Sequence, residues 1–413
     1  MTQIRLVVTT PFFVLLAASF CLGLATPGAG AVAASLRQAK TPIAAPPSGP
    51  GLGAGGMPTF ATDAREAMVV DYNAGTVLLA KNIDQPMPTA SLSKIMTAYL
   101  VFQYLKEGRI KLSDALPVSE KAWRTGGSKM FVPYHGHVSV SDLLRGMLVE
   151  SGNDACVVLA QGLAGSTEAF VAEMNAEAKK LGLTHSHFAN VDGLPDPSHY
   201  MSARDIVTLA EDYLHNFPQY YPIVGEKEFT FDKITQHNRN PLLYKHLGVD
   251  GIKTGHTQEA GYSLLASAVR HGRRIILLVS GLDTAGARAR ESENLLNWAY
   301  RAFVDLDVAK PGLAIDEAPV WYGVKSTVPV STRTDTIVTV PRGELSKVKI
   351  TAVYDGEIKA PIAAGKAVGT LEVALPDGET KKFPLVTLAA VKRLDAIGRI
   401  ADALAHYLWG TRH

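Results

Sequence analysis

Residues 261–282, GYSLLASAVRHGRRIILLVSGL, contain two apolar runs on either side of the turn RHGR at 270–273. Long runs rich in Val, Ile and Leu that are joined by a glycine-containing turn are typical of a β-hairpin. We interpret the basic residues of this turn as a solvated hairpin tip and not as an anion site. Residues 66–82, EAMVVDYNAGTVLLAKN, predict a second hairpin around NAG at 73–75.

Apolar residues at helical spacing occupy most of the chain between these two hairpins. The predicted helices cover 91–106, 141–149, 153–163, 166–181 and 202–215, and a further helix is expected near 285–303. Because strands lie at both ends of a helical middle, residues 59–308 are predicted to form an α+β domain whose terminal elements share one sheet.

The remainder of the chain divides by composition. Residues 34–58 are rich in Ala, Pro and Gly and lack an apolar period, which predicts a flexible linker. Residues 311–387 consist of short alternating runs separated by Pro and Gly, which predicts a small all-β, sandwich-like domain. Residues 388–413 return to helical spacing and predict an amphipathic helix.

Two interpretations fit this C-terminal helix. Its apolar stripe comprises Leu394, Ile397, Ala401, Leu404 and Leu408, with Lys392, Arg399 and Asp402 on other sides. In the first interpretation the stripe packs on the all-β domain. In the second it lies in a membrane interface, with Tyr407 and Trp409 at the depth of the headgroups. Periodicity alone does not decide between them.

The amino terminus has the pattern of an export signal. Residues 1–33 combine a positive charge at Arg5, a long apolar core and the small-residue site AVA at 31–33; an uncleaved membrane anchor is the alternative. Cleavage after this site would remove Cys21 and leave Cys156 alone, so no internal disulfide is expected. The chain has 41 basic and 39 acidic residues, and this near balance argues against a nucleic-acid partner.

Ser91 and Lys94, within TASLSKIMTAYL at 89–100, are a pair that could act as a nucleophile and its base. Their i,i+3 spacing puts both side chains on one face of a helix that Pro88 and Thr89 begin. Free backbone N–H groups in a first turn favour the negative charge that develops during nucleophilic attack. A lysine that is buried near a second cation loses its proton and can act as the base. A helix-capping serine and a solvent-reaching lysine would show the same spacing.

Two later motifs distinguish these possibilities. SGN at 151–153 and KTG at 253–255 follow in the order found in serine β-lactamases and penicillin-binding proteins. The surrounding sequence resembles the serine D-alanyl-D-alanine carboxypeptidases, the low-molecular-mass penicillin-binding proteins. The resemblance covers roughly residues 60–390 and rests on PTASLSKIMT, TGGSKMFV, LVESGNDA, DGLPDPSHYMSARDI, NRNPLL and VDGIKTGHTQEAGYSL.

This resemblance implies a β-lactamase/transpeptidase-like fold, in which an antiparallel sheet carries a helical subdomain. It also implies the catalytic roles. Ser91 would attack the carbonyl between the two terminal D-alanines, and Lys94 would take its proton. Ser151 and Lys253 would relay the proton to the leaving amine, and the charge of Lys253 would keep Lys94 neutral.

The resemblance further implies a set of substrate-binding residues: Asn153, Thr254, Gly255, His256, Arg239 and Ser128. Asn153 would hydrogen-bond the peptide, while Thr254 and Arg239 would hold its terminal carboxylate. The oxyanion hole would use the backbone N–H groups of Ser91 and His256. Ser128 would line the cleft.

The implied partners and location follow from the same resemblance. The substrate would be a peptidoglycan stem peptide ending in D-Ala-D-Ala, β-lactams would be covalent inhibitors, and no cofactor or metal is expected. The protein would be exported to the periplasm, and its C-terminal helix would attach it peripherally to the outer face of the cytoplasmic membrane.

Three rival functions fit the sequence less well. The pairs His135/His137 and His185/His187 could suggest a zinc carboxypeptidase, but neither has a helix-spaced partner or an obvious carboxylate ligand. A class A β-lactamase would need a glutamate that activates water, and we interpret Glu211 as structural. A receptor without catalysis could dispense with the serines and lysines that this chain retains.

Overall fold

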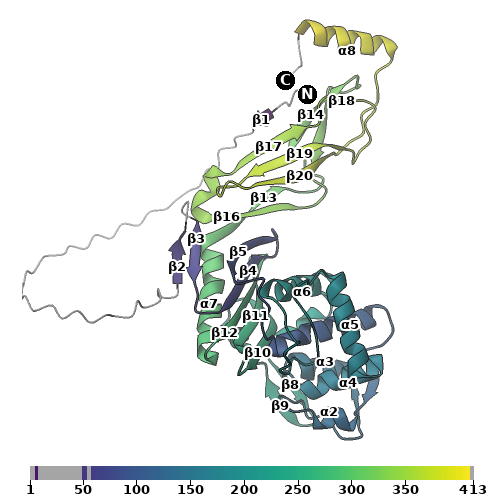
Figure 1. The fold of residues 1–413 in the computed structure, drawn as a ribbon. Helices are drawn as coiled ribbons and strands as arrows, with labels where there is room; N and C mark the ends of the chain where they lie inside the picture. Colours follow the sequence, from purple (N-terminus) through teal and green to yellow (C-terminus); the bar gives the residue numbers. More distant parts are fainter. Residues whose placement is uncertain (1–4, 8–48, 54–56, 410–413) are drawn as a thin grey trace, which may run out of the picture. The chain divides into compact units, whose positions relative to one another are not determined.

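The computed structural model describes residues 5–7, 49–53 and 57–409 (Figure 1). The chain forms two compact units. The first comprises Ser48–Val308 with Thr336–Leu345, and the second comprises Met1–Pro47, Ala309–Asp335 and Ser346–His413. Apart from strand β1 (Arg5–Val7), the predicted signal sequence lies outside the described residues, as does most of the predicted linker.

The first unit contains a five-stranded antiparallel sheet. Its strands are, in spatial order, β10 (Val249–Thr257), β11 (Gly261–Arg270), β12 (Arg273–Leu282), β4 (Glu66–Asp71) and β5 (Thr76–Lys81). Both predicted hairpins are confirmed, and the pairing of β12 with β4 joins them. The start and the end of the first unit therefore share one sheet, as an α+β fold requires.

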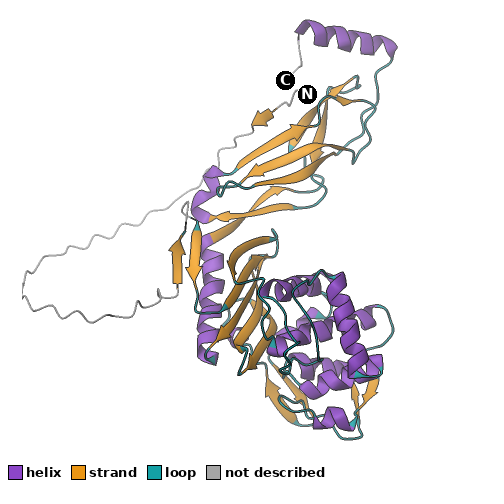
Figure 2. Cartoon of the chain, in the orientation of Figure 1, coloured by secondary structure: helices purple, strands orange, loops and turns teal. Residues whose placement is uncertain are grey.

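Both faces of this sheet are buried, and this explains why its central strands are almost continuously apolar. Successive side chains of a strand point to opposite faces. Met68 and Val70 of β4 belong to the core shared with the helical subdomain, whereas Val69 joins Trp298 in a second core. Trp298 belongs to α7 (Ala285–Ala302), which Figure 2 shows on the opposite side of the sheet from the α-helices that lie between β5 and β10 in the chain.

The helical subdomain follows β5 in the chain. It consists of η2 (Ala90–Ser93), α1 (Lys94–Lys106), α2 (Glu120–Arg124), α3 (Val140–Leu148), α4 (Asn153–Ala164), α5 (Thr167–Lys180), α6 (Ala203–Asn216), η3 (Tyr221–Gly225) and η4 (Pro241–Tyr244). Several of these helices begin after a serine whose hydroxyl accepts a backbone hydrogen bond from three residues on, as Ser139, Ser166 and Ser202 do. The predicted helices are confirmed with small shifts at their ends.

Four two-stranded ladders complete the first unit. They pair β2 (Gly49–Leu52) with β3 (Pro58–Ala61), β6 (Ala115–Pro117) with β7 (His137–Ser139), β8 (Glu228–Phe231) with β9 (Ile234–His237), and β13 (Phe303–Ala309) with β16 (Thr336–Pro341). Two of them differ from the expected domain limits. Strand β2 lies inside the predicted linker, and β16 leaves the predicted all-β domain because its backbone pairs with β13.

The second unit is built on a seven-stranded sheet. The spatial order of its strands is β1, β17 (Lys349–Tyr354), β19 (Ala367–Ala374), β20 (Thr380–Thr387), β15 (Thr327–Ser331), β14 (Asp316–Trp321) and β18 (Ile358–Lys359). In the chain, the short helix η5 (Arg342–Lys347) precedes β17, and α8 (Ala396–Trp409) follows β20. The predicted all-β module and C-terminal helix are thus both present. Among the described residues, no single helix could cross a bilayer; only the bent pair of α4 and α5, at 86°, passes on length and composition.

The apolar stripe of α8 does not pack on the all-β domain. Of the predicted stripe, Ile397 and Leu404 are 79% and 55% exposed, and Ile400 and Tyr407 of the same helix are 63% and 86% exposed. It is the polar Asp402 whose carboxylate accepts a hydrogen bond from the backbone N–H of Tyr322 in the all-β domain, at 3.0 Å. The docking interpretation of the stripe is therefore wrong for these residues; the side chains of Leu408 and Trp409 lie outside the described residues.

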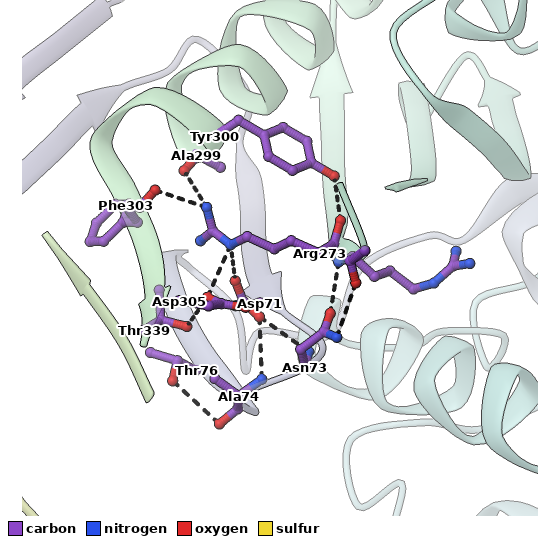
Figure 3. A network of polar contacts seen from close by, with 12 residues as sticks. Asp71, Asn73, Ala74, Thr76, Arg273, Ala299, Tyr300, Phe303, Asp305 and Thr339 are labelled. Carbon is purple, nitrogen blue, oxygen red and sulfur yellow. Dashed lines mark hydrogen bonds and ion pairs between the residues drawn. The ribbon is translucent and has the colours of Figure 1, made fainter. Parts of the chain in front are cut away.

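The interpretation of 270–273 as a solvated hairpin tip is wrong for Arg273. Its side chain is only 11% exposed, and its Nε lies 2.6 Å from Asp71 Oδ2 and 3.0 Å from Asp305 Oδ1 (Figure 3). Its Nη1 donates to the carbonyl of Phe303 at 2.9 Å. Because Asp71 ends β4 and Asp305 lies on β13, the tip of the hairpin is held by carboxylates that are distant in sequence.

Candidate active site

Ser91 lies in the 3-10 helix η2, directly before α1. The sequence placed it in the first turn of an α-helix, but the α-helix begins only at Lys94. A tight turn replaces the α-helical one because the N–H of Leu92 donates to the carbonyl of Thr89, at 3.1 Å. The half-buried Ser91 side chain and the fully buried Lys94 side chain still come together across this junction.

The amine of Lys94 has three oxygen neighbours. Its Nζ lies 2.9 Å from Ser91 Oγ, 2.7 Å from Asn153 Oδ1 and 2.5 Å from the carbonyl oxygen of Asp192. The amide oxygen and the carbonyl can only accept, so they take two N–H groups. A neutral amine then directs its lone pair towards Ser91, whose hydroxyl can donate. This is the arrangement of a base with its nucleophile.

Burial favours the neutral form of this amine. It is the main cause that lowers the pKa of Lys94, and the charge of Arg239 lowers it further, while Cys156, Asp192 and Asp154 oppose the shift. The pKa of Lys253 lies well below its usual value, first because of burial and next because of the positive charge of Lys94.

These causes agree with the prediction that burial lowers the pKa of Lys94. The sequence predicted that Lys94 loses its proton because it is buried near a second cation, Lys253. In the structure, burial is the leading cause for both lysines, and the charge of Lys94 lowers the pKa of Lys253 further. Repulsion between two buried cations favours the loss of a proton from the pair.

Strand β10 brings the third motif against η2. A Cβ atom at Gly255 would lie 3.0 Å from the carbonyl of Thr89 and 3.2 Å from Leu92 Cγ. Glycine therefore favours the close approach of the strand to η2. Lys253 and Thr254 precede it as buried residues, and Lys253 Nζ donates to the carbonyl of Thr254 at 3.2 Å.

The second motif lies at the start of α4. Ser151 is buried, with a left-handed φ of 67°, and Asn153 is the first residue of the helix. The amide of Asn153 spans the site: Oδ1 accepts from Lys94, and Nδ2 donates to the carbonyl of Gly126 at 2.8 Å. This side chain therefore links the nucleophile pair to the loop that carries Ser128.

The structure brings two of the predicted substrate-binding residues together at this loop. Arg239 donates from Nη1 to Ser128 Oγ at 2.6 Å. The exposed imidazole of His256 stacks on Tyr262, with ring centroids 3.9 Å apart. The ring is thus fixed by packing, which agrees with a role for the backbone of His256 and not for its imidazole.

Sequence reasoning gave no role to three residues that shape the site. Asp192 supplies the carbonyl that holds Lys94, and a Cβ at the neighbouring Gly193 would come within 1.9 Å of the Ala90 carbonyl. Asp154 accepts hydrogen bonds from the N–H groups of Met130, Phe131 and Val132 and so organises the Ser128 loop. All three lie within LVESGNDA or DGLPDPSHYMSARDI, but their role depends on chain crossings that spacing does not reveal.

A cavity of about 250 Å³ adjoins η2. It is lined in part by Pro88, Thr89 and Ala90 on one side and by Gly193 and His199 on the other. Among the described residues, no group of three or more His, Cys, Asp or Glu side chains could hold a metal. Glu211 lies on α6, where its charge adds to the burial that raises the pKa of Tyr72.

His199 makes the stability of this region dependent on pH. Its buried Nδ1 accepts hydrogen bonds from the N–H groups of Ala189 and Asn190, and burial lowers its pKa from 6.5 to about 4. Between these values the unfolded chain binds a proton and the folded chain does not. The contribution of His199 to the free energy of unfolding is therefore present in full above pH 6.5. It is expected to be lost, by roughly 3 kcal/mol, as the pH falls from 6.5 through 4.

Urea unfolding between pH 7.5 and 4 tests this expectation against His199→Asn, whose amide oxygen can accept the same hydrogen bonds. Other groups titrate equally in both proteins, so the difference between them isolates His199. The wild-type protein should lose more stability than the variant on acidification. If the free energy of unfolding fell equally with pH in both proteins, His199 would not be the group responsible.

The contact of Ser91 with Lys94, together with the buried Ser151 and Lys253 and the setting of an antiparallel sheet and a helical subdomain, points to a serine hydrolase of the penicillin-binding type. The sequence agrees with this class. Residues 55–284 match the peptidase S11 family, described as D-alanyl-D-alanine carboxypeptidase, and residues 303–393 match the C-terminal domain of penicillin-binding protein 5. The chain belongs to the D-alanyl-D-alanine carboxypeptidase family.

Characterised relatives cover most of the chain. D-alanyl-D-alanine carboxypeptidases DacC and DacA of Escherichia coli K12 are 42% and 40% identical, over 82% of this chain and 87% and 86% of their own lengths. Penicillin-binding protein 5 of Haemophilus influenzae matches with a TM-score of 0.74 and 39% identity, over 81% of this chain and 98% of its own. Penicillin-binding protein D2 of Listeria monocytogenes, solved in an ampicillin-bound form, has a TM-score of 0.54 and 32% identity, covering 59% of this chain and 99% of its own.

Proposed function

We propose that this carboxypeptidase removes the terminal D-alanine of peptidoglycan stem peptides through an acyl-enzyme on Ser91. Lys94 takes the hydroxyl proton as Ser91 attacks the penultimate carbonyl carbon. The backbone N–H groups of Ser91 and His256 stabilise the oxyanion. Ser151 and Lys253 then relay this proton from Lys94 to the nitrogen of the departing D-alanine, the carbon–nitrogen bond breaks, and Lys94 returns to its neutral form.

Deacylation uses the same groups in reverse roles. Water attacks the ester carbonyl, Lys94 accepts its proton, and Ser91 leaves with a proton restored to its oxygen. Asn153 positions the peptide, and Thr254 with Arg239 holds the carboxylate of the leaving residue. A β-lactam mimics the substrate and acylates the same serine, with slow turnover of the product.

The observation that carries this mechanism is the 2.9 Å approach of Lys94 Nζ to Ser91 Oγ within a buried, polar-lined setting. It is tested by incubating the purified protein with a peptide ending in Lys-D-Ala-D-Ala and measuring free D-alanine. Release of one D-alanine per peptide is expected. An absence of release would contradict the proposal, and nitrocefin hydrolysis at rates typical of resistance enzymes would favour a β-lactamase instead.

We further propose that the protein acts in the periplasm and that α8 attaches it to the membrane surface. The exposed apolar residues of α8 recur three or four positions apart and so form one stripe. Lys392, Arg393 and Arg399 at its start suit anionic lipid headgroups. The absence of a packing partner for Ile397, Ile400 and Leu404 in the described all-β domain supports this attachment.

The triple variant Ile397→Ser, Ile400→Ser and Leu404→Ser should reduce binding to phosphatidylglycerol-containing vesicles by about tenfold or more, because it removes apolar surface that would enter the interface. Flotation of the full chain with vesicles measures the bound fraction. Leu313→Ser removes an apolar residue that is 63% exposed outside α8 and should leave binding unchanged. Equal flotation of all three proteins would refute membrane attachment by this stripe.

A further inference from the structure

Glu150 is a buried carboxyl group in the catalytic unit that the mechanism above does not use. It immediately precedes Ser151, between α3 and α4, and its side chain is only 1% exposed. One carboxyl oxygen, Oε2, accepts a hydrogen bond from Gln236 Nε2 at 3.0 Å. The other, Oε1, is buried without a hydrogen-bond partner. Ionising such a group is unfavourable unless a cation compensates for it.

The geometry connects Glu150 to Arg239. Gln236 lies on β9, three residues before Arg239, and its Nε2 also donates to the carbonyl of Lys129 at 2.8 Å. Lys129 is the neighbour of Ser128, whose hydroxyl accepts from Arg239 at 2.6 Å. Glu150, the Ser128 loop and the arginine segment are therefore tied together by one glutamine side chain.

Two charged groups act on Glu150. Asp154, on α4, disfavours its ionisation, and Arg239 favours it. Burial is the largest cause that raises the pKa of Glu150, Asp154 raises it further and Arg239 lowers it, which leaves it at about 7. The carboxyl group thus changes its charge near neutral pH, within the range in which a periplasmic enzyme works.

We infer that Glu150 is a positioning residue that sets how strongly Arg239 attracts the substrate's terminal carboxylate. The neutral carboxyl leaves the full positive charge of Arg239 for the substrate. When Glu150 loses its proton, its negative charge offsets that of Arg239, and carboxylate binding weakens. The inference rests on the proposed role of Arg239 and adds a pH-dependent control of substrate affinity.

Kinetics of D-alanine release between pH 6 and 8.5 provide the main test. KM of the wild-type enzyme should rise by about fivefold across this range as Glu150 ionises. In Glu150→Gln, whose amide resembles the neutral carboxyl, KM should stay low at every pH, while the kcat profile remains that of the wild type. A wild-type KM that does not rise, an unchanged rise in the variant, or an effect on kcat alone would overturn the inference.

Two further variants locate the effect. Gln236→Leu keeps Glu150 but removes a hydrogen bond that favours its ionised form, so the rise in KM should move to higher pH. This result does not depend on whether Glu150→Gln folds. Arg239→Gln should abolish the pH dependence of KM, and adding Glu150→Gln to it should change nothing more. A pH dependence that survives in Arg239→Gln would show that Glu150 acts elsewhere.

Acylation by a fluorescent penicillin separates this inference from the proposed function. The drug carries its own carboxylate, so its second-order acylation rate should fall with rising pH in the wild type relative to Glu150→Gln. Failure of D-alanine release with this difference intact would refute the carboxypeptidase proposal alone. Release that proceeds normally while neither assay distinguishes the two proteins would refute the role of Glu150 alone.

Discussion

Ser91→Ala is expected to reduce D-alanine release by about 10³-fold or more and to leave no covalent penicillin adduct, because removal of a nucleophile abolishes the acyl-enzyme. The fold should persist. Ser91 is half-buried at the surface of η2, and the substitution removes one hydroxyl without creating a large cavity. Assays of D-alanine release and of fluorescent-penicillin labelling measure the effect.

Ser93→Ala is the matched control for this change. Ser93 lies two residues further along η2, is fully buried, and donates its hydroxyl to the carbonyl of Ala90 at 3.1 Å. Its loss should lower the free energy of unfolding by about 1 kcal/mol while activity remains. D-alanine release at a normal rate from Ser91→Ala would reject Ser91 as the nucleophile.

Lys94→Arg is the second change with a large expected effect. A guanidinium cannot give up its proton, so the variant carries a permanent positive charge and has no base. We expect kcat/KM for D-alanine release to fall by about 10³-fold. Raising the pH to 9 should not restore it, because the guanidinium stays protonated, whereas burial lowers the pKa of Lys94 and so favours its neutral form. The pH profiles of both proteins provide the measurement.

Lys106→Arg serves as the control because Lys106 ends the same helix and is exposed. It should retain wild-type activity and stability. Thermal unfolding of Lys94→Arg must be compared as well, since the larger group enters a buried site. A folded Lys94→Arg enzyme with activity within tenfold of the wild type would contradict the role of Lys94 as the base.

The sequence predicted the sheet and the contact between Ser91 and Lys94 for clear physical reasons. The hairpins at 66–82 and 261–282 have long apolar runs and glycine-containing turns, so local pattern and tertiary structure agree. Ser91 and Lys94 are close in sequence, and a single turn brings them together. Gly255 could be recognised from its motif, although its steric reason appears only where β10 meets η2.

What the sequence missed depends on residues that are distant along the chain. Arg273 belongs to a turn that looks solvated, and only the fold brings Asp71 and Asp305 to it. The carbonyl of Asp192 reaches Lys94 across 98 positions, and a backbone acceptor leaves no trace in residue type. The exposure of the α8 stripe was undecidable from periodicity, because a docked helix and an interfacial helix share the same spacing.

In the proposed mechanism Ser91 carries the acyl group. Mass spectrometry of the full chain after reaction with benzylpenicillin, followed by proteolytic mapping, tests it directly. We predict one added drug molecule per protein, attached to the hydroxyl of Ser91. An adduct on another residue, or stoichiometric D-alanine release by a protein that never forms an adduct at Ser91, would contradict the account.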